Sequence, residues 1–442
     1  MPTPSRSYVA RASRARARKV APVSRRLLTL AVTIGSVAIA APAAPASAGG
    51  AAREVHIGAL LSVTGDGADL GTTSKEALEI ATQRWNARKD KKVKVVLDVE
   101  NTNLEAEQAQ AALTRLADKG VRIAIGPQSS SEVAAISEQA AARGVILVSQ
   151  GSTASSLGLP DDNVFRFVPT DRVEGRASTD LMLHNKASTI IPIWRNDRGN
   201  NGLAESVRAA ATSSGATVTE GVRYEPDTTD FSTALADLST QVQAAIASAG
   251  ADKVAVYLAG FEEVADIFTA ARTVTGLDGV RWYGADGSAQ TKVLLDSGPA
   301  TFSTSAKVAG FPSPLVALPE SQAKRAASLL REISKRAKNE ADAFTLAAYD
   351  AFNVAARALA ETSVDTDTAT LRLAFATSAQ GAKGTTGTIR LDPAGDRLST
   401  PYAFWSVCQR GKKPRWTETG TWTPASDPAA PGQVSPKNCP KR

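Results

Sequence analysis

Short apolar runs rich in β-branched residues alternate with helix-like segments along most of this 442-residue chain. Residues 55–62 and 93–99 have the pattern of strands, and residues 74–87 between them carry apolar side chains at helical spacing. The alternation begins again after Pro169. Strands that alternate with helices usually pair in parallel, so the pattern predicts an α/β fold with parallel sheets, and its restart predicts two lobes.

The last third of the chain departs from this alternation. Two long helical patterns, at about residues 319–337 and 343–361, follow each other directly. Strand-like runs at 387–391 and 402–409 come next, separated by a turn sequence rich in Asp, Pro and Gly. This arrangement predicts a pair of helices and then a hairpin.

Two segments, one helix apart, place small and hydroxyl-bearing residues where expected strands end. Residues 126–131 contain three consecutive serines, and residues 149–153 read Ser-Gln-Gly-Ser-Thr. The carboxyl ends of parallel strands share one edge of a sheet, where ligands bind in α/β folds. Free N–H groups and hydroxyls there favour a carboxylate or another small anion. The serines could also serve only as helix caps, since Ser129 and Glu132 have the capping-box spacing, and both roles stay open.

The first 48 residues differ in character from the rest. They contain eight basic residues and no acidic one, an apolar stretch at 27–41, and the small-residue pattern Ala46-Ser47-Ala48. These are the parts of a secretory signal peptide, cleaved after Ala48. Arg25-Arg26 also fits a twin-arginine signal, so both export routes stay open. Because no cysteine lies near the cut site, we expect an exported protein that is not a lipoprotein, located in the periplasm, cell wall or medium.

Removal of that segment changes the charge balance. The full chain has 51 basic and 44 acidic residues, and loss of eight basic residues leaves 43 against 44. The net charge of the mature chain is therefore close to zero, and we expect no nucleic-acid partner.

Cys408 and Cys439 are the only cysteines in the sequence. In an exported protein an even pair favours one disulfide, which would join the proline-rich C-terminal tail to the last expected strand. Two free thiols are the alternative. His56 and His184 are the only histidines, and they stand far apart in the chain, so we expect no metal site.

The sequence lacks the usual signatures of catalysis and cofactor binding. Gly65 and Gly67 begin a pattern close to the dinucleotide-binding fingerprint, but Leu70 stands where its third glycine is required. There is no Walker motif and no G-x-S-x-G nucleophile elbow. We therefore expect a non-enzymatic protein without a cofactor, with a secreted α/β hydrolase as the less favoured alternative.

Taken together, these features resemble the periplasmic substrate-binding proteins of the Leu/Ile/Val-binding type, which serve ABC importers. The resemblance covers about residues 53–410 and rests on the order and spacing of segments 57–62, 125–131, 149–153, 283–287, 348–351 and 384–391. It implies a type I periplasmic-binding-protein clamshell in which each lobe is a parallel sheet flanked by helices and the chain crosses between the lobes three times. The implied division is a signal peptide at 1–48, lobe 1 at 53–170 and 309–385, lobe 2 at 171–308 and 386–410, and a tail at 411–442.

The resemblance also implies a ligand cleft between the lobes. Ser130 would bind a ligand carboxylate, with Gly151 and Thr153 adding contacts, and Asp286 would pair with an ammonium group. Asp286 could instead cap a helix that starts near Ser288. The aromatic residues implied for the side-chain pocket could equally belong to the core. The full implied set is Ser130, Ser131, Gly151, Ser152, Thr153, Asp286, Phe261 and Phe344.

The function implied is that of a monomeric extracytoplasmic protein that captures a small amino-acid-like ligand and delivers it to the permease of an ABC importer. A ligand-sensing receptor component of the same fold is the alternative, because transport and sensing need the same clamshell. The loop at 195–201 has no aromatic residue where the branched-chain amino-acid binders usually place one, and Leu70 replaces another aromatic. These departures leave open a polar or non-amino-acid ligand.

Overall fold

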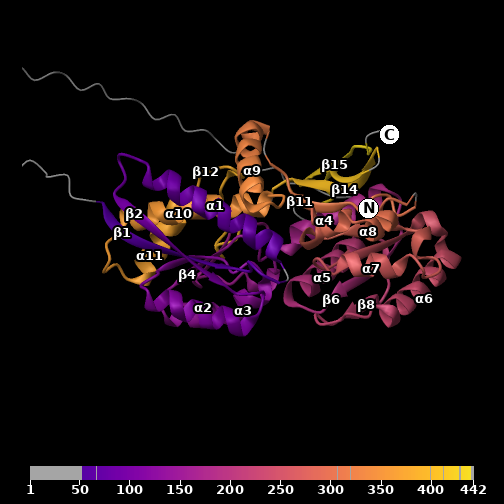
Figure 1. Cartoon of the computed structure of the whole chain (residues 1–442). Helices are drawn as coiled ribbons and strands as arrows, with labels where there is room; N and C mark the ends of the chain where they lie inside the picture. Colours follow the sequence, from indigo (N-terminus) through magenta and orange to yellow (C-terminus); the bar gives the residue numbers. More distant parts are fainter. Residues whose placement is uncertain are drawn as a thin grey trace, which may run out of the picture. The chain divides into compact units, whose positions relative to one another are not determined.

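The computed structural model describes residues 52–439, apart from positions 66, 306, 319, 399, 412, 428 and 429 (Figure 1). Contacts divide the chain into Met1–Gly50 and Ala51–Arg442, and the elements given below are those of the described part of the second unit. The expected signal peptide and its cleavage site after Ala48 lie outside the described residues. Among the described residues, no helix combines the length and apolar character that a membrane crossing requires.

The first lobe is built on a five-stranded sheet in the order β2-β1-β3-β4-β5, in which every pair is parallel. Its strands are β1 (Arg53–Leu61), β2 (Val93–Asn101), β3 (Ile123–Ile125), β4 (Ile146–Ser149) and β5 (Val164–Arg166). The intervening helices are α1 (Ala68–Asn86), α2 (Ala106–Asp118) and α3 (Ser130–Ala142). The central strands β3 and β4 are apolar and buried on both faces, because helices cover both sides of a parallel sheet.

The second lobe repeats this plan with parallel strands in the order β10-β9-β6-β7, and β8 also pairs with β6. Its strands are β6 (Thr189–Arg195), β7 (Thr217–Val218), β8 (Val222–Tyr224), β9 (Val254–Ala259) and β10 (Arg281–Gly284). Its helices are α4 (Asp171–His184), α5 (Arg198–Ser213), α6 (Ser232–Ala249), α7 (Val264–Ala271) and α8 (Ser297–Ser303). Short 3-10 turns occur at Ser155–Leu157, Ala251–Lys253, Leu277–Gly279, Asp286–Ser288, Val293–Leu295 and Glu320–Gln322.

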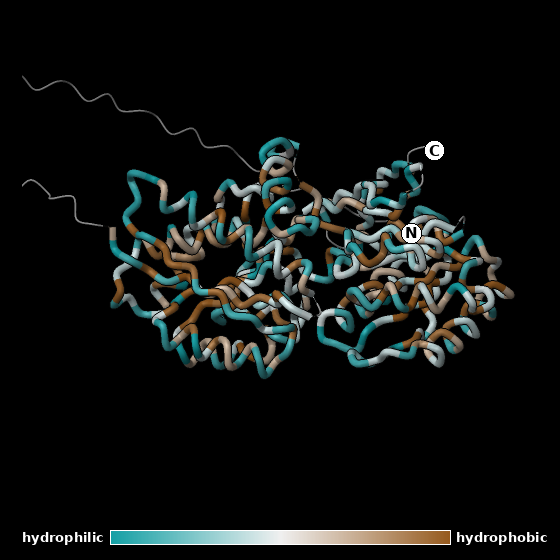
Figure 2. Tube along the Cα trace, in the orientation of Figure 1, coloured by the Kyte–Doolittle hydropathy of each residue, from teal (hydrophilic) through white to brown (hydrophobic). Residues whose placement is uncertain are grey.

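Three chain crossings join the two lobes. The first lies between β5 and α4, the second between β11 (Ser313–Val316) and α9 (Ala323–Ala337), and the third between β13 (Gly387–Thr388) and β14 (Tyr402–Arg410). After the second crossing, α9, α10 (Ala343–Glu361) and α11 (Thr368–Ala379) return to the first lobe, where α10 packs against α1. The predicted two-lobed α/β clamshell is thus confirmed, and Figure 2 shows hydrophobic residues concentrated along its strands.

The C-terminal strands pair differently from the expected hairpin. β13 pairs with β12 (Lys383–Gly384), whereas β14 lies between β11 and β15 (Lys413–Thr423), and β15 also pairs with β16 (Gln433–Pro436). The hairpin predicted between 387–391 and 402–409 is therefore wrong. Its first arm is short, and Leu391 forms an isolated bridge with Arg397 instead. β14 pairs with β11, which is distant in the sequence, and with β15, which follows it directly. Two strands of this antiparallel sheet come from the tail that was expected after residue 410.

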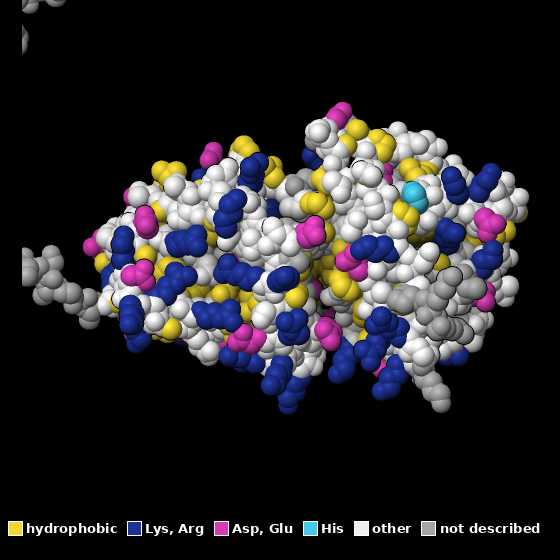
Figure 3. Space-filling view, turned by 90° about the horizontal axis from the view of Figure 1, so that it is seen from above, with side chains coloured by type: hydrophobic (Ala, Val, Ile, Leu, Met, Phe, Trp, Pro, Cys, Tyr) yellow, Lys and Arg dark blue, Asp and Glu magenta, His cyan; other side chains and the backbone are white. Residues whose placement is uncertain are grey.

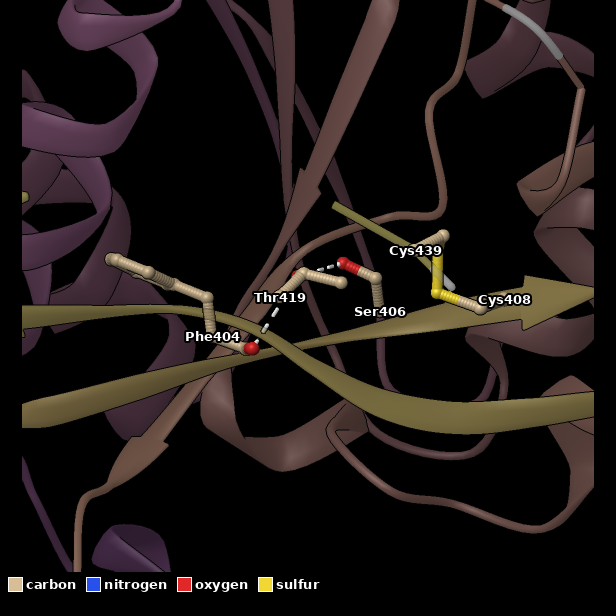
Figure 4. Close-up of a disulfide and its surroundings, with 5 residues drawn as sticks. All are labelled: Phe404, Ser406, Cys408, Thr419 and Cys439. Carbon is tan, nitrogen blue, oxygen red and sulfur yellow. Dashed lines mark hydrogen bonds between the residues drawn. A yellow bond between two sulfur atoms is a disulfide. The ribbon is translucent and has the colours of Figure 1, made fainter. Parts of the chain in front are cut away.

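The predicted disulfide is confirmed. Cys408 on β14 is bonded to Cys439, and their Cα atoms lie 5.6 Å apart (Figure 4). Close to the disulfide, the hydroxyl of Ser406 on β14 is hydrogen-bonded to the hydroxyl of Thr419 on β15 at 2.6 Å. The disulfide therefore fixes the end of the chain to the sheet formed by β14 and β15.

Two helices, α1 and α5, begin earlier than the sequence pattern predicts. α1 begins at Ala68 rather than near residue 74, so Gly71 lies within the helix. A Cβ at Gly71 would stand only 1.6 Å from the carbonyl oxygen of Ser62, so glycine lets α1 approach the end of β1. α5 begins at Arg198, four residues before its expected start, because the Asp197 side chain accepts a hydrogen bond from the backbone N–H of Asn200 and caps the helix.

A buried ion pair ties the third crossing to the first lobe. Arg166, the last residue of β5, donates from Nε and Nη2 to the two carboxylate oxygens of Asp396, each at 2.5 Å. The two side chains are only 1% and 5% exposed. This bidentate contact fixes the turn at 392–396 against the edge of the sheet, immediately before the chain leaves for β14.

Candidate functional site

A cavity of about 250 Å³ opens where strand ends of the two lobes face each other. From the first lobe it is lined by the segments that follow β1, β3 and β4 and by the start of α10; from the second, by the segments after β6, β9 and β10. All the expected binding residues line this interlobe cavity except Ser152. Residues 130–131, 151, 153 and Phe344 come from the first lobe, and Phe261 and Asp286 from the second.

The turn after β3 has a conformation that its sequence enforces. Gly126 has φ +101°, and a Cβ there would stand 2.1 Å from the carbonyl oxygen of Leu60. Three residues later, Ser129 caps α3: its hydroxyl accepts from the N–H of Glu132, whose carboxylate accepts from the N–H of Ser129. The predicted capping box is therefore confirmed, and it leaves Ser130 as the first residue of the helix at the cavity wall.

The turn after β4 packs directly against that of β3. The hydroxyls of Ser130 and Ser152 lie 3.0 Å apart, and the N–H of Ala154 donates to Ser130 Oγ at 3.2 Å. Ser152 is fully buried behind Ser130, which explains why it does not reach the cavity. The N–H of Gly151 donates to Ser149 Oγ at 3.3 Å, so the loop is held from within. The first lobe thus presents two adjoining, internally braced turns to the cavity.

Asp286 forms part of the opposite wall. Its backbone N–H donates to Glu174 Oε1 at 3.0 Å, and burial raises the pKa of the Asp286 carboxyl to about 6. The predicted alternative, a cap on a helix starting near Ser288, is wrong: only the 3-10 turn Asp286–Ser288 forms, and no side chain caps it. The side chain of Asp286 is therefore free of a capping role.

Behind Asp286 lie further buried carboxyls. Burial raises the pKa of Glu174 well above its usual range, and the nearby Asp286 raises it further. Burial also raises the pKa of Asp171 to about 7, and a hydrogen bond with the Thr153 side chain opposes that shift. Glu174 Oε2 and Asp171 Oδ1 have no hydrogen-bond partner among the described residues. Buried carboxyl groups therefore lie behind this end of the cavity, and their ionisation is costly because water does not solvate the charge.

An arginine and an aromatic ring form the next part of the second-lobe wall. The guanidinium of Arg195 lies 5.4 Å from the centre of the Phe261 ring. Arg195 also contacts the carboxylates of Asp197, at 3.3 Å, and Glu263, at 3.6 Å. The positive charge of Arg195 is therefore balanced by carboxylates of the protein. Residues 195–201, which were expected to form a loop, contain the start of α5.

Direct hydrogen bonds already join the two lobes around the cavity. The N–H of Gly67 donates to Glu262 Oε2 at 3.3 Å. Arg198 reaches the first lobe twice, from its N–H to Ser131 Oγ and from Nη1 to Ser156 Oγ, both at 3.3 Å. These contacts show that the two walls approach each other closely.

Sequence reasoning did not identify Glu262, Arg195 or Glu174. Glu262 follows Phe261 after the end of β9, so the rule that ligands meet strand ends could have found it. The same rule applies to Arg195, the last residue of β6. Glu174 reaches Asp286 from the first turn of α4, 112 residues away in the sequence, and no local pattern marks that contact.

The sequence of this chain is similar to those of known protein families and proteins. A model of the periplasmic binding protein family matches residues 54–412. An uncharacterized protein of Methanocaldococcus jannaschii is 27% identical over 388 residues, which is 83% of this chain and 89% of that protein. A Leu/Ile/Val-binding protein of Rhizobium johnstonii is 28% identical over 212 residues, 47% of this chain and 55% of that protein.

The fold has close structural counterparts. The crystal structure of the leucine-binding protein LivK from Thermotoga maritima has a TM-score of 0.67 and 21% sequence identity, covering 82% of this chain and 97% of that one. At this identity the likeness concerns the fold.

Proposed function

The chain belongs to the periplasmic binding protein family, and on that premise we propose that it captures a small amino-acid-like solute in the interlobe cavity and delivers it to the permease of an ABC importer. It acts without chemistry on the solute. Export with removal of the signal peptide after Ala48 is part of the same proposal.

The observation that carries the proposal is the pairing of opposite chemistries across the cavity. The turns at Ser130 and Thr153 offer hydroxyls and the amino-terminal end of the 13-residue helix α3, a combination that favours a carboxylate. Asp286, on the other lobe, offers a carboxylate whose ionised form an ammonium group would stabilise. A zwitterion would touch both lobes, so its binding would favour the closed clamshell.

Two variants separate the two ends of this site. Asp286→Asn is expected to weaken norleucine strongly and hexanoate, its des-amino analogue, very little, because only norleucine has an ammonium group. Loss of one partner of a desolvated charge pair costs roughly 2–5 kcal/mol. Ser130→Ala is expected to weaken both ligands alike, by about 1 kcal/mol for a lost hydrogen bond.

Calorimetric titration of the exported protein measures these effects. Ser137→Ala is the matched control, because Ser137 lies on the same helix as Ser130 but not at the cavity. Equal losses of norleucine and hexanoate in Asp286→Asn would remove Asp286 from the ammonium role. If no solute with both an amine and a carboxylate raises the unfolding temperature, the proposed function is refuted.

A further inference from the structure

The interlobe cavity is far more acidic than a site for a neutral amino acid requires. Lys and Arg side chains are spread over the molecular face in Figure 3, with Asp and Glu between them. The described lining of the cavity instead has six carboxylates against two cationic side chains, Arg195 and Lys292. Arg195 is already balanced by Asp197 and Glu263, and Lys292 is exposed. The carboxylates of the lining therefore outnumber the cationic side chains available to balance them.

Two of the six carboxylates cap helices, and a third is exposed to solvent. Asp342 caps α10, accepting from the N–H of Thr345 at 2.9 Å, and Asp197 caps α5. Glu340 is exposed at the rim. Asp286 is assigned above to the ligand's α-ammonium group. That leaves Asp69 and Glu262. Glu262 accepts the hydrogen bond from Gly67, but among the described residues neither carboxylate caps a helix or pairs with a basic side chain.

Asp69 and Glu262 come from opposite lobes and meet at the cavity. Asp69 lies in the first turn of α1, and Glu262 accepts a hydrogen bond from the N–H of Gly67, two residues before Asp69. Gln128 holds this loop in place by donating from Nε2 to the carbonyl of Gly67 at 2.9 Å. Within the described part of the chain, no ion pair joins either carboxylate to a basic side chain.

Their environment makes this proximity costly. The pKa of Glu262 is raised to about 7, chiefly by burial, with smaller contributions from the negative charges of Asp69 and Glu263. Two like charges that approach across a closing cleft repel each other unless a proton or a cation lies between them. The walls beside the pair are apolar: Leu70 follows Asp69, and the Phe261 ring lies against Gly287, where a Cβ would stand 2.8 Å from it.

We propose that the ligand carries a second cationic group, an ammonium or guanidinium, which binds between Asp69 and Glu262, so that the preferred solute is a basic amino acid. This inference rests on the proposed function and specifies its substrate class. The aliphatic part of such a side chain packs against Leu70 and Phe261, and the terminal cation takes the place of the proton that the two carboxylates would otherwise share. Closure of the lobes then brings both carboxylates onto one cation.

Lysine and norleucine provide the test, because they differ only in the terminal ammonium group. In calorimetric titrations of the exported protein near pH 7.5, lysine is expected to bind at least tenfold more tightly than norleucine. Asp69→Asn and Glu262→Gln are each expected to weaken lysine about tenfold and to change norleucine less than about twofold. Glu340→Gln is the matched control: it removes a carboxylate from the same cavity rim and should leave the preference for lysine unchanged.

The outcomes separate the inference from the proposed function. If norleucine binds as tightly as lysine, the second cation site is refuted, while the solute-binding function stands. The site is also refuted if Glu340→Gln reduces lysine binding as much as Asp69→Asn and Glu262→Gln do, since the attraction would then come from general charge. If neither amino acid binds, the second cation site is refuted, and the proposed function fails as well if no other solute with both an amine and a carboxylate raises the unfolding temperature. Because the ligand comparison is made on the unmodified protein, it remains decisive even if one variant does not fold.

Discussion

The buried carboxyl groups beside the cavity predict that folding stability falls as the pH rises. Asp171 is fully buried, and burial raises its pKa from 3.8 to about 7. Asp286 shifts in the same direction, to about 6. In the unfolded chain both carboxyl groups have ordinary pKa values. The folded protein therefore binds more protons than the unfolded chain between about pH 4 and pH 7, and stability decreases across that window.

The expected size follows from the shift of Asp171 alone. Below pH 3.8 this carboxyl is protonated in both states, so its contribution to stability is fully present. That contribution is lost as the pH rises through about 7, where the folded carboxyl must ionise without water. Between about pH 5 and pH 8 the loss amounts to roughly 2–3 kcal/mol.

Urea unfolding of the ligand-free protein at about pH 5 and pH 8 measures this change. Asp171→Asn keeps the shape of the side chain but cannot ionise, so it should remove most of the pH dependence and be more stable than the wild type at pH 8. Asp118→Asn is the control, because the Asp118 side chain is 62% exposed and its pH dependence should match that of the wild type. Stability that increases from pH 5 to pH 8, or an Asp171→Asn variant with the slope of the wild type, would refute the reasoning.

Two further predictions concern the framework around the cavity. Asp396→Asn leaves the charge of Arg166 buried and unpaired, so the free energy of unfolding in urea should fall by about 3–5 kcal/mol, and a loss below 1 kcal/mol would show that the pair is dispensable. Cys408→Ser opens the disulfide to Cys439, whose loop spans 31 residues, and should lower stability by about 3–4 kcal/mol at constant ligand concentration. An unchanged urea midpoint after reduction of the wild type would contradict this second prediction.

Local signals were sufficient for much of the fold. The strand at residues 123–125 and the helix at 343–361 could be read from the sequence because their apolar spacing is decided within a few residues. The capping box at Ser129 and Glu132 is similarly local, since both partners lie within one helical turn. Because the carboxyl ends of parallel strands share one edge of a sheet, these turns could be predicted to lie together. Most of the residues expected at that edge do line the cavity.

Features that depend on distant partners could not be read in this way. The strand at 402–410 pairs with residues 313–316, which lie far away in the sequence, and nothing within its own sequence distinguishes this from a hairpin with 387–391. Its other partner, residues 413–423, follows it directly but was expected to belong to the tail. The pKa values of buried carboxyl groups also depend on residues that are distant in the sequence. The pKa of Glu174 is set by its burial and by Asp286, on another element, so its role as a neighbour of the cavity emerges only from tertiary structure.

If the proposed function holds, the placement of these carboxyls couples lobe closure to the charge of the ligand. Asp69 and Glu262 line the same cavity from opposite lobes, and the Glu174–Asp286 pair is buried behind the second-lobe wall, so negative charge is confined at both places where water is scarce. A neutral solute could fill the cavity without relieving that cost. Under the proposed function, a solute with an ammonium at each end would relieve it at both places, and the carboxylate of the solute at Ser130 would fix its direction. Closure would then select for the charge distribution of the solute as well as for its shape, since the free energy of closure would depend on where the cations lie.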